Sequence, residues 1–88
     1  MEIRQAVVGS SVGLHARPAA VFVQAVTDSG HAVTIGRPGD VRIDARSILS
    51  VMGLGAAYGD IVEIAVEGAD EAAVADELTR IVESNLDG

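Results

Sequence analysis

Residues 60–67 read Asp-Ile-Val-Glu-Ile-Ala-Val-Glu, with large apolar side chains at every second position from Val62 onward. Successive side chains of a β-strand point to opposite sides of a sheet, so Val62, Ile64 and Val66 are expected on a buried face. The residues between them are expected to face water, as in antiparallel sheets that are covered on one side. The stretch therefore predicts a sheet with helices packed against one of its two faces.

The segment after this strand is predicted to be a helix that covers the sheet. Apolar residues recur at helical spacing over 71–85, and those expected to be buried are Val74, Leu78, Ile81 and Val82. Asp70 stands just before this segment and is a good N-cap residue. The charged residues between the apolar positions are expected to form a solvated side.

The earlier part of the chain supplies three more predicted strands and two more helices. Strands are expected over 2–8, 31–36 and 41–44, with a tight turn over 37–40 joining the last two. A first helix should run from about residue 16 to about residue 27, and Ser47 should cap a short helix that ends at Gly53. The buried stripe of the first helix is expected to contain Ala16, Ala19, Ala20, Val23 and Val26.

The resulting order, β-α-β-β-α-β-α, places residues 1–88 in the α+β class as one domain. The hairpin over 33–43 requires one antiparallel strand pair, and the split β-α-β order favours an antiparallel sheet throughout. We therefore predict a four-stranded antiparallel sheet with three helices on one face.

Composition excludes several classes of function. The formal net charge of −7 and the presence of only two aromatic residues argue against a nucleic-acid partner. The chain has no cysteine, which excludes disulfides and thiolate metal sites and favours a reducing cytoplasm. Two histidines, His15 and His31, make a zinc site improbable, and no stretch is apolar for long enough to span a membrane. His31 stands between a loop and a strand with no second ligand or base nearby, and we expect no chemistry there.

Residues 13–19, Gly-Leu-His-Ala-Arg-Pro-Ala, place a histidine and an arginine where the first helix begins. Pro18 is favoured at the first helical position, so His15 and Ala16 should lie at or just before the N-terminus. Backbone N–H groups without intrahelical partners and the helix dipole make that end suited to an anion. Arg17 adds a permanent charge that fits phosphate or carboxylate. His15 can then act as a nucleophile for a phosphoryl group, although a solvated surface histidine would give the same pattern.

Residues 45–55 form a second informative stretch. Ile48, Leu49, Val51 and Met52 are too many large apolar residues for one side of so short a helix. All four could belong to the core. Alternatively, some of them form an exposed patch that binds partners, a role to which methionine is suited.

The string over 13–19 resembles the active-site signature of the HPr family, the histidine phosphocarriers of the phosphoenolpyruvate-dependent sugar phosphotransferase system. Residues 45–55 are similar to the segment around the regulatory serine of that family, and the resemblance covers essentially the whole chain. It implies an open-faced β-sandwich with three helices and a cytoplasmic, monomeric phosphoprotein of sugar transport. It also implies a phosphoryl carrier rather than a stand-alone enzyme, without cofactor or metal.

By this resemblance, His15 accepts a phosphoryl group on Nδ1 from phosphorylated enzyme I and passes it to the IIA component of a sugar permease. Arg17 and the backbone N–H groups of Ala16 and Arg17 would hold the phosphate. The imidazole must be unprotonated to attack. Partner proteins would dock on a surface comprising Ala20, Phe22, Ile48, Leu49 and Met52.

Two further positions, Ser47 and Val12, bear on this resemblance. In some relatives the serine that matches Ser47 is phosphorylated by a dedicated kinase, and the product binds a catabolite-control repressor; Ser47 also has a sufficient role as an N-cap. Val12 stands where relatives often carry a small polar residue.

Three alternatives to a sugar-system carrier remain. The same histidine chemistry would serve a nitrogen-related phosphorelay. A regulatory homologue that binds a transcription factor typically lacks the histidine, so His15 counts against it. A small-molecule or RNA-binding domain is disfavoured by the acidity and the lack of aromatic residues.

Overall fold

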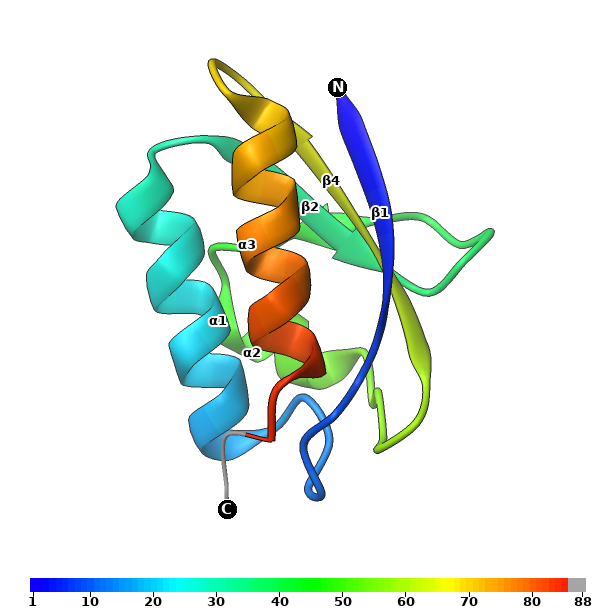
Figure 1. Ribbon diagram of the computed structural model, residues 1–88. Helices are drawn as coiled ribbons and strands as arrows, with labels where there is room; N and C mark the ends of the chain where they lie inside the picture. The colour runs from blue at the N-terminus through cyan, green and yellow to red at the C-terminus, as the bar shows by residue number, and fades with distance from the viewer. Residues whose placement is uncertain (86–88) are drawn as a thin grey trace.

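A computed structural model describes residues 1–85 and contains one four-stranded sheet (Figure 1). Its strands are β1 (Glu2–Val7), β2 (Ala32–Gly36), β3 (Ile43–Asp44) and β4 (Ile61–Glu67). They lie in the order β1-β4-β2-β3, and each neighbouring pair is antiparallel. The predicted antiparallel sheet is therefore confirmed, with the strand from the opening sequence at its centre.

Three helices cover one face of this sheet: α1 (Ala16–Ser29), α2 (Ile48–Gly53) and α3 (Glu71–Glu83) (Figure 1). The order of elements is the predicted one, and the α+β open-faced sandwich is confirmed. Among residues 1–85, no helix combines the length and apolarity that crossing a bilayer requires.

The core lies between the sheet and the helices. Val62, Ile64 and Val66 of β4 are completely buried there, as the alternation predicts. Leu78 and Val82 of α3 are buried against the sheet, whereas Val74 and Ile81 are only partly buried at the edge of the core. The helical period predicted for α3 is therefore confirmed, but its fully buried residues include Ala75 rather than Val74 and Ile81.

The predicted buried stripe of α1 was wrong in part. Its buried residues are Pro18, Ala19, Phe22 and Val26, whereas Ala16 and Ala20 are exposed. Phe22 buries far more apolar area than an alanine does, so the helix turns this residue into the core. The helix begins at Ala16, which has a φ of +50°, so Pro18 is its third residue and not, as predicted, its first.

Two local expectations also need correction. The hairpin strand expected over 41–44 is reduced to Ile43–Asp44, and Val41 is exposed. Asp70 occupies the N-cap position of α3, but its φ is +55° and its side chain makes no capping hydrogen bond. The carboxylate of Glu71 instead accepts a hydrogen bond from the N–H of Gly68 and pairs with the N-terminal ammonium group of Met1.

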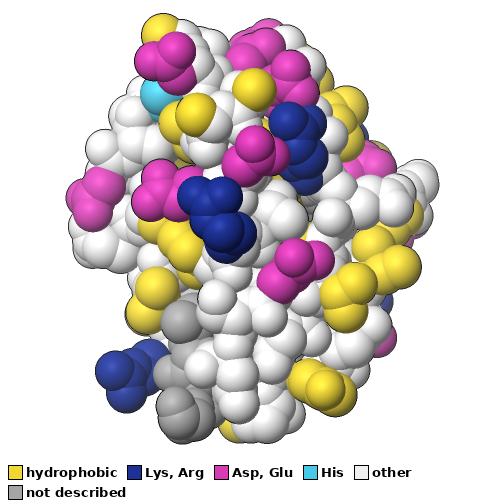
Figure 2. All heavy atoms as spheres, viewed as in Figure 1, with side chains coloured by type: hydrophobic (Ala, Val, Ile, Leu, Met, Phe, Trp, Pro, Cys, Tyr) yellow, Lys and Arg dark blue, Asp and Glu magenta, His cyan; other side chains and the backbone are white. Residues whose placement is uncertain are grey.

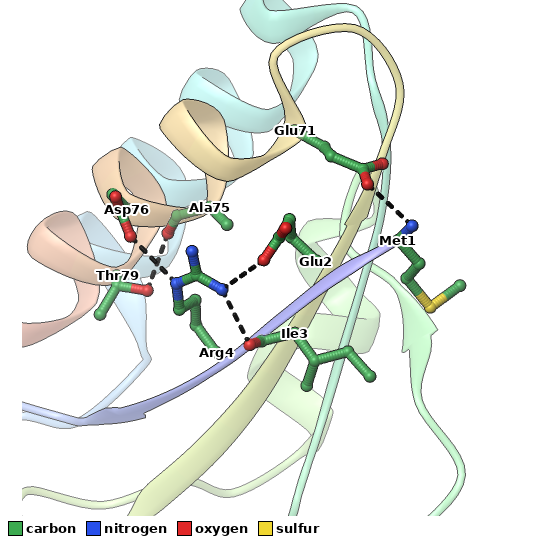
Figure 3. A network of polar contacts seen from close by, with 8 residues as sticks. All are labelled: Met1, Glu2, Ile3, Arg4, Glu71, Ala75, Asp76 and Thr79. Atoms are coloured by element: carbon green, nitrogen blue, oxygen red, sulfur yellow. Dashed lines mark hydrogen bonds and ion pairs between the residues drawn. The ribbon is translucent and has the colours of Figure 1, made fainter.

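Polar contacts fasten the edge strand β1 to α3 (Figure 3). The guanidinium group of Arg4 binds the carboxylate of Asp76 on α3, at 3.0 Å, and that of Glu2, at 2.7 Å. The pair between Met1 and Glu71 lies at the start of the same helix. These contacts fix the two terminal elements of the fold to each other.

Candidate functional site

His15 occupies the N-cap position of α1, where the sequence places it. Its backbone is extended, with φ −142° and ψ 157°, and its side chain makes no capping hydrogen bond to the helix. The residue is exposed. The imidazole is therefore open to solvent beside the positive end of a 14-residue helix.

Ala16 follows in a left-handed conformation, with a φ of +50°. Such a φ is uncommon for a residue with a Cβ and costs about 1–3 kcal/mol, and strained backbone of this kind clusters at functional sites. Ala16 and Arg17 are the first two residues of α1, so their N–H groups are among those that a helix cannot satisfy internally. The backbone here can donate to an anion held next to His15.

Arg17 extends the same site with an exposed guanidinium group. The arginines that form ion pairs with carboxylates of residues 1–85 are Arg4, Arg37, Arg42 and Arg46, and Arg17 forms none with that part of the chain. A guanidinium group without an internal carboxylate partner is the group best suited to bind phosphate oxygens in two-point geometry.

The loop before His15 is held by backbone hydrogen bonds. The N–H of Gly13 donates to the carbonyl of Ser10 at 2.9 Å, and that of Leu14 donates to the carbonyl of Ala56 at 2.9 Å. The Leu14 side chain is buried in the core. Val12, where relatives often carry a small polar residue, has an exposed side chain in this loop. The backbone immediately before His15 is thus anchored to the segment that joins α2 to β4.

The sequence does not predict the hydrogen bond from Leu14 to Ala56. Ala56 lies between Gly55 and Gly59, both of which have a positive φ. Closely spaced glycines mark loops in which one backbone segment can approach another. Gly55 and Gly59 were therefore the sequence feature that could have indicated this contact.

Helix α2 packs beside α1 and divides its apolar residues between core and surface. Val51 is fully buried and Met52 is partly buried, whereas Ile48 is 37% and Leu49 is 77% exposed. Of the two alternatives, the one that places all four residues in the core is therefore wrong, and the one with an exposed apolar patch fits. Ser47 accepts a hydrogen bond from the N–H of Ser50, at 3.3 Å, which confirms it as the N-cap.

Phe22 is completely buried and is removed from the predicted docking surface. Ala20, one helical turn beyond Ala16, is exposed, and so is Val21. The exposed apolar surface that α1 and α2 offer thus consists of Ala20, Val21, Ile48 and Leu49, with Met52 partly accessible.

Charge is distributed unevenly over the face of the molecule that Figure 2 shows. Acidic side chains lie mainly over the upper half of the face shown in Figure 2, whereas α1 begins at the lower end of the same view.

Within residues 1–85, no three histidine, aspartate or glutamate side chains gather to hold a metal ion. The site consists of an imidazole, a guanidinium group and a helix terminus.

His31 lies at the opposite end of α1 and takes no part in this site. Its ring contacts backbone carbonyls of Ala69 and Ser29, and these hydrogen bonds, that of Ala69 first, raise its pKa above the ordinary value. These contacts to backbone carbonyls were not predicted from the sequence, and they give His31 a structural role.

Comparison with known proteins identifies the same arrangement. The family model described as the PTS HPr component phosphorylation site matches residues 3–84. A phosphocarrier protein HPr of Streptomyces coelicolor is 38% identical over 87 residues, which cover 99% of this chain and 94% of that protein. The structure of HPr from Thermoanaerobacter tengcongensis aligns with a TM-score of 0.89 at 31% identity and covers 100% of this chain and 98% of the other. A phosphocarrier HPr of Bacillus anthracis aligns with a TM-score of 0.84 at 31% identity, covering 92% and 95%.

Proposed function

Because the chain belongs to the HPr family of phosphocarrier proteins, we propose that it accepts a phosphoryl group on His15 from phosphorylated enzyme I and passes it to the IIA component of a sugar permease. The observation that carries this proposal is the exposed His15 at the N-terminus of α1, followed by Arg17. We propose that the protein acts in the cytoplasm, as is consistent with its family.

In the proposed step, Nδ1 of neutral His15 attacks the phosphorus atom with its lone pair. The N–P bond forms as the bond between phosphorus and the donor atom of enzyme I breaks, and that donor atom recovers its electron pair. Arg17 and the N–H groups of Ala16 and Arg17 would neutralise the phosphate oxygens during this in-line transfer. The protein contributes position and charge rather than a separate chemical reaction.

A carrier must also release the group that it accepts. One guanidinium group and a helix terminus in water supply moderate stabilisation, since an exposed pair is weakened by solvent. The exposure of His15 and Arg17 fits that requirement. The group can therefore be held and passed on without a large barrier in either direction.

Partners are proposed to dock on the surface formed by α1 and α2. Leu49 is its most exposed large residue, and Ala20, Ile48 and Met52 complete it. Ser47 is proposed as a second, regulatory phosphorylation site, because a phosphate at this cap would lie next to the apolar surface and disturb docking. That modification would need a protein kinase and would create a surface for a repressor.

The proposal is tested by mass spectrometry of the wild type and His15→Ala after incubation with phosphoenolpyruvate, magnesium and enzyme I. One acid-labile phosphate on the wild type and none on the variant is the expected result. If the wild type stays unmodified with a cognate enzyme I, the carrier function is wrong and a regulatory role without phosphohistidine becomes the better explanation.

A further inference from the structure

Arg37 lies in the hairpin between β2 and β3 and reaches across to the segment that follows α2. Its Nη2 donates to the carbonyls of Leu54, at 3.1 Å, and Gly55, at 2.9 Å. Its Nη1 pairs with Oδ2 of Asp60 at 3.3 Å. One guanidinium group thus holds both ends of the segment 54–60.

Asp60 fixes the interior of that segment. Its Oδ2 also accepts a hydrogen bond from the N–H of Ala57 at 2.9 Å, and this bond, with Arg37, lowers the pKa of its carboxyl group. The carbonyl of Asp60 accepts a hydrogen bond from the N–H of Val8, the residue after β1, and the N–H of Asp60 donates to the carbonyl of Ala57. Arg37 and Asp60 together therefore hold the backbone of residues 54–57 through hydrogen bonds on both sides of Ala56.

Ala56 lies within this segment and connects it directly to the loop that carries His15. Its carbonyl accepts the N–H of Leu14, the residue before His15, at 2.9 Å. The same carbonyl lies so near Gly13 that a Cβ there would stand 2.4 Å away from it. A shift of Ala56 must therefore move the backbone that carries His15.

The hairpin gives Arg37 a fixed origin for this contact. The N–H of Asp40 donates to the carbonyl of Arg37 at 3.0 Å, with Pro38 and Gly39, at φ +84°, between them. This is the pattern of a type II turn, which restricts the backbone of Arg37. Asp60 and Arg37 are each more than a third exposed, so the ion pair itself adds little to the stability of the fold.

We infer that Arg37 is a positioning residue for phosphoryl transfer, acting through residues 54–60 and the Leu14–Ala56 hydrogen bond on the backbone of His15. This inference rests on the proposed carrier function. Replacing Arg37 should lower kcat more than it raises KM, because Arg37 is not one of the residues of the proposed docking surface. Misplacement of a reacting group by about 1 Å can lower a rate by up to 10²-fold.

The test compares Arg37→Met with Arg37→Lys and a matched control, Arg42→Met. Arg42 lies in the same hairpin, but its guanidinium group pairs with Glu63 and Thr34 of the sheet. Phosphorylation of His15 is measured with an enzyme I that modifies the wild type, over a range of carrier concentrations. Hydrogen exchange of the Leu14 amide is measured separately without any enzyme, together with urea denaturation.

For Arg37→Met we expect kcat to fall about tenfold with KM nearly unchanged, and exchange at Leu14 to accelerate by a similar factor. Arg37→Lys should recover part of both effects, because it keeps the charge but loses the planar fork. Arg42→Met should leave both as in the wild type. If Arg37→Met keeps the kcat and the Leu14 exchange rate of the wild type, the inference is wrong. It is also wrong if Arg42→Met changes both quantities as much as Arg37→Met does. Absence of phosphorylation in the wild type would refute the carrier function, and the exchange measurement would still decide whether Arg37 orders Leu14.

Discussion

Gly13 and Ala56 approach each other so closely that an ideal Cβ on Gly13 would lie 2.4 Å from the carbonyl oxygen of Ala56. Gly13 also has a φ of +76°, a conformation in which side chains are strained. The contact joins the loop before His15 to the segment after α2. Because the obstacle is backbone, it cannot be relieved by turning a side chain.

We therefore expect Gly13→Ala to lower the free energy of unfolding by about 3 kcal/mol, from steric overlap together with strain. Gly30→Ala is the matched control, because Gly30 has a similar φ of +70° but no atom within 4 Å of its ideal Cβ. It should cost only about 1 kcal/mol. Urea denaturation measures both, and equal losses would show that the contact with Ala56 has no energetic weight.

If the proposed transfer is correct, Arg17→Met should slow phosphorylation of His15 by about 10- to 100-fold, because the charge proposed to face the phosphate is lost. Stability should change little, since Arg17 is exposed. Arg4→Met is the control, because Arg4 binds Asp76 on α3 and Glu2 on β1. Initial rates with phosphoenolpyruvate and enzyme I provide the measurement. If the two variants have the same rate, Arg17 does not stabilise the phosphoryl group.

Leu49→Ala should raise KM for the donor protein while leaving stability within about 0.5 kcal/mol of the wild type. Leu49 is 77% exposed on α2. Val51→Ala, two residues later, should show the opposite behaviour and lose about 1–3 kcal/mol, because Val51 is completely buried. Steady-state kinetics and thermal denaturation together separate docking from packing. An unchanged KM in Leu49→Ala would remove this residue from the docking surface.

Ser47→Ala should destabilise the fold by about 1 kcal/mol, because the hydroxyl of Ser47 caps α2 through the N–H of Ser50. Ser47→Asp keeps a capping oxygen and should restore that stability. Its charge should nevertheless weaken docking if Ser47 is a regulatory site, as a phosphate would. Denaturation and the phosphorylation rate of His15 are measured on both variants. Wild-type kinetics in Ser47→Asp would leave the cap as the only role of the residue.

The sequence predicts those features of the fold that depend on local period. The alternation around Val62 and Ile64 defines the central strand, and the residues around Pro18 locate the start of α1. It also places His15 and Arg17 together, since they are neighbours in the chain. Which side of α1 faces the core depends on the fit of Phe22 among residues distant in sequence, and the period alone did not decide it.

Contacts between distant loops were not predictable in the same way. Arg37 reads as a turn residue and Ala56 as part of a glycine-rich loop, and nothing in their spacing joins them to Leu14. Their relation arises from the order of strands in the sheet, which brings the hairpin and the segment 54–60 together. His31 is a similar case, because its partner Ala69 is 38 residues away.

The ring of His31 is held between two backbone carbonyls, with Nδ1 2.7 Å from the oxygen of Ser29 and Nε2 against that of Ala69. Carbonyls only accept, so both bonds form at once only when both ring nitrogens are protonated. These bonds, and the nearby carboxylates of Asp70 and Glu71, raise the pKa of His31 in the folded state. The resulting stabilisation is complete below the unfolded value of about 6.5 and is lost as pH rises through the higher folded value. We expect the urea midpoint of the wild type to fall over this interval more than that of His31→Gln, which cannot titrate. The comparison cancels the other groups, including the N-terminal amine paired with Glu71, and parallel curves for the two proteins would contradict the prediction.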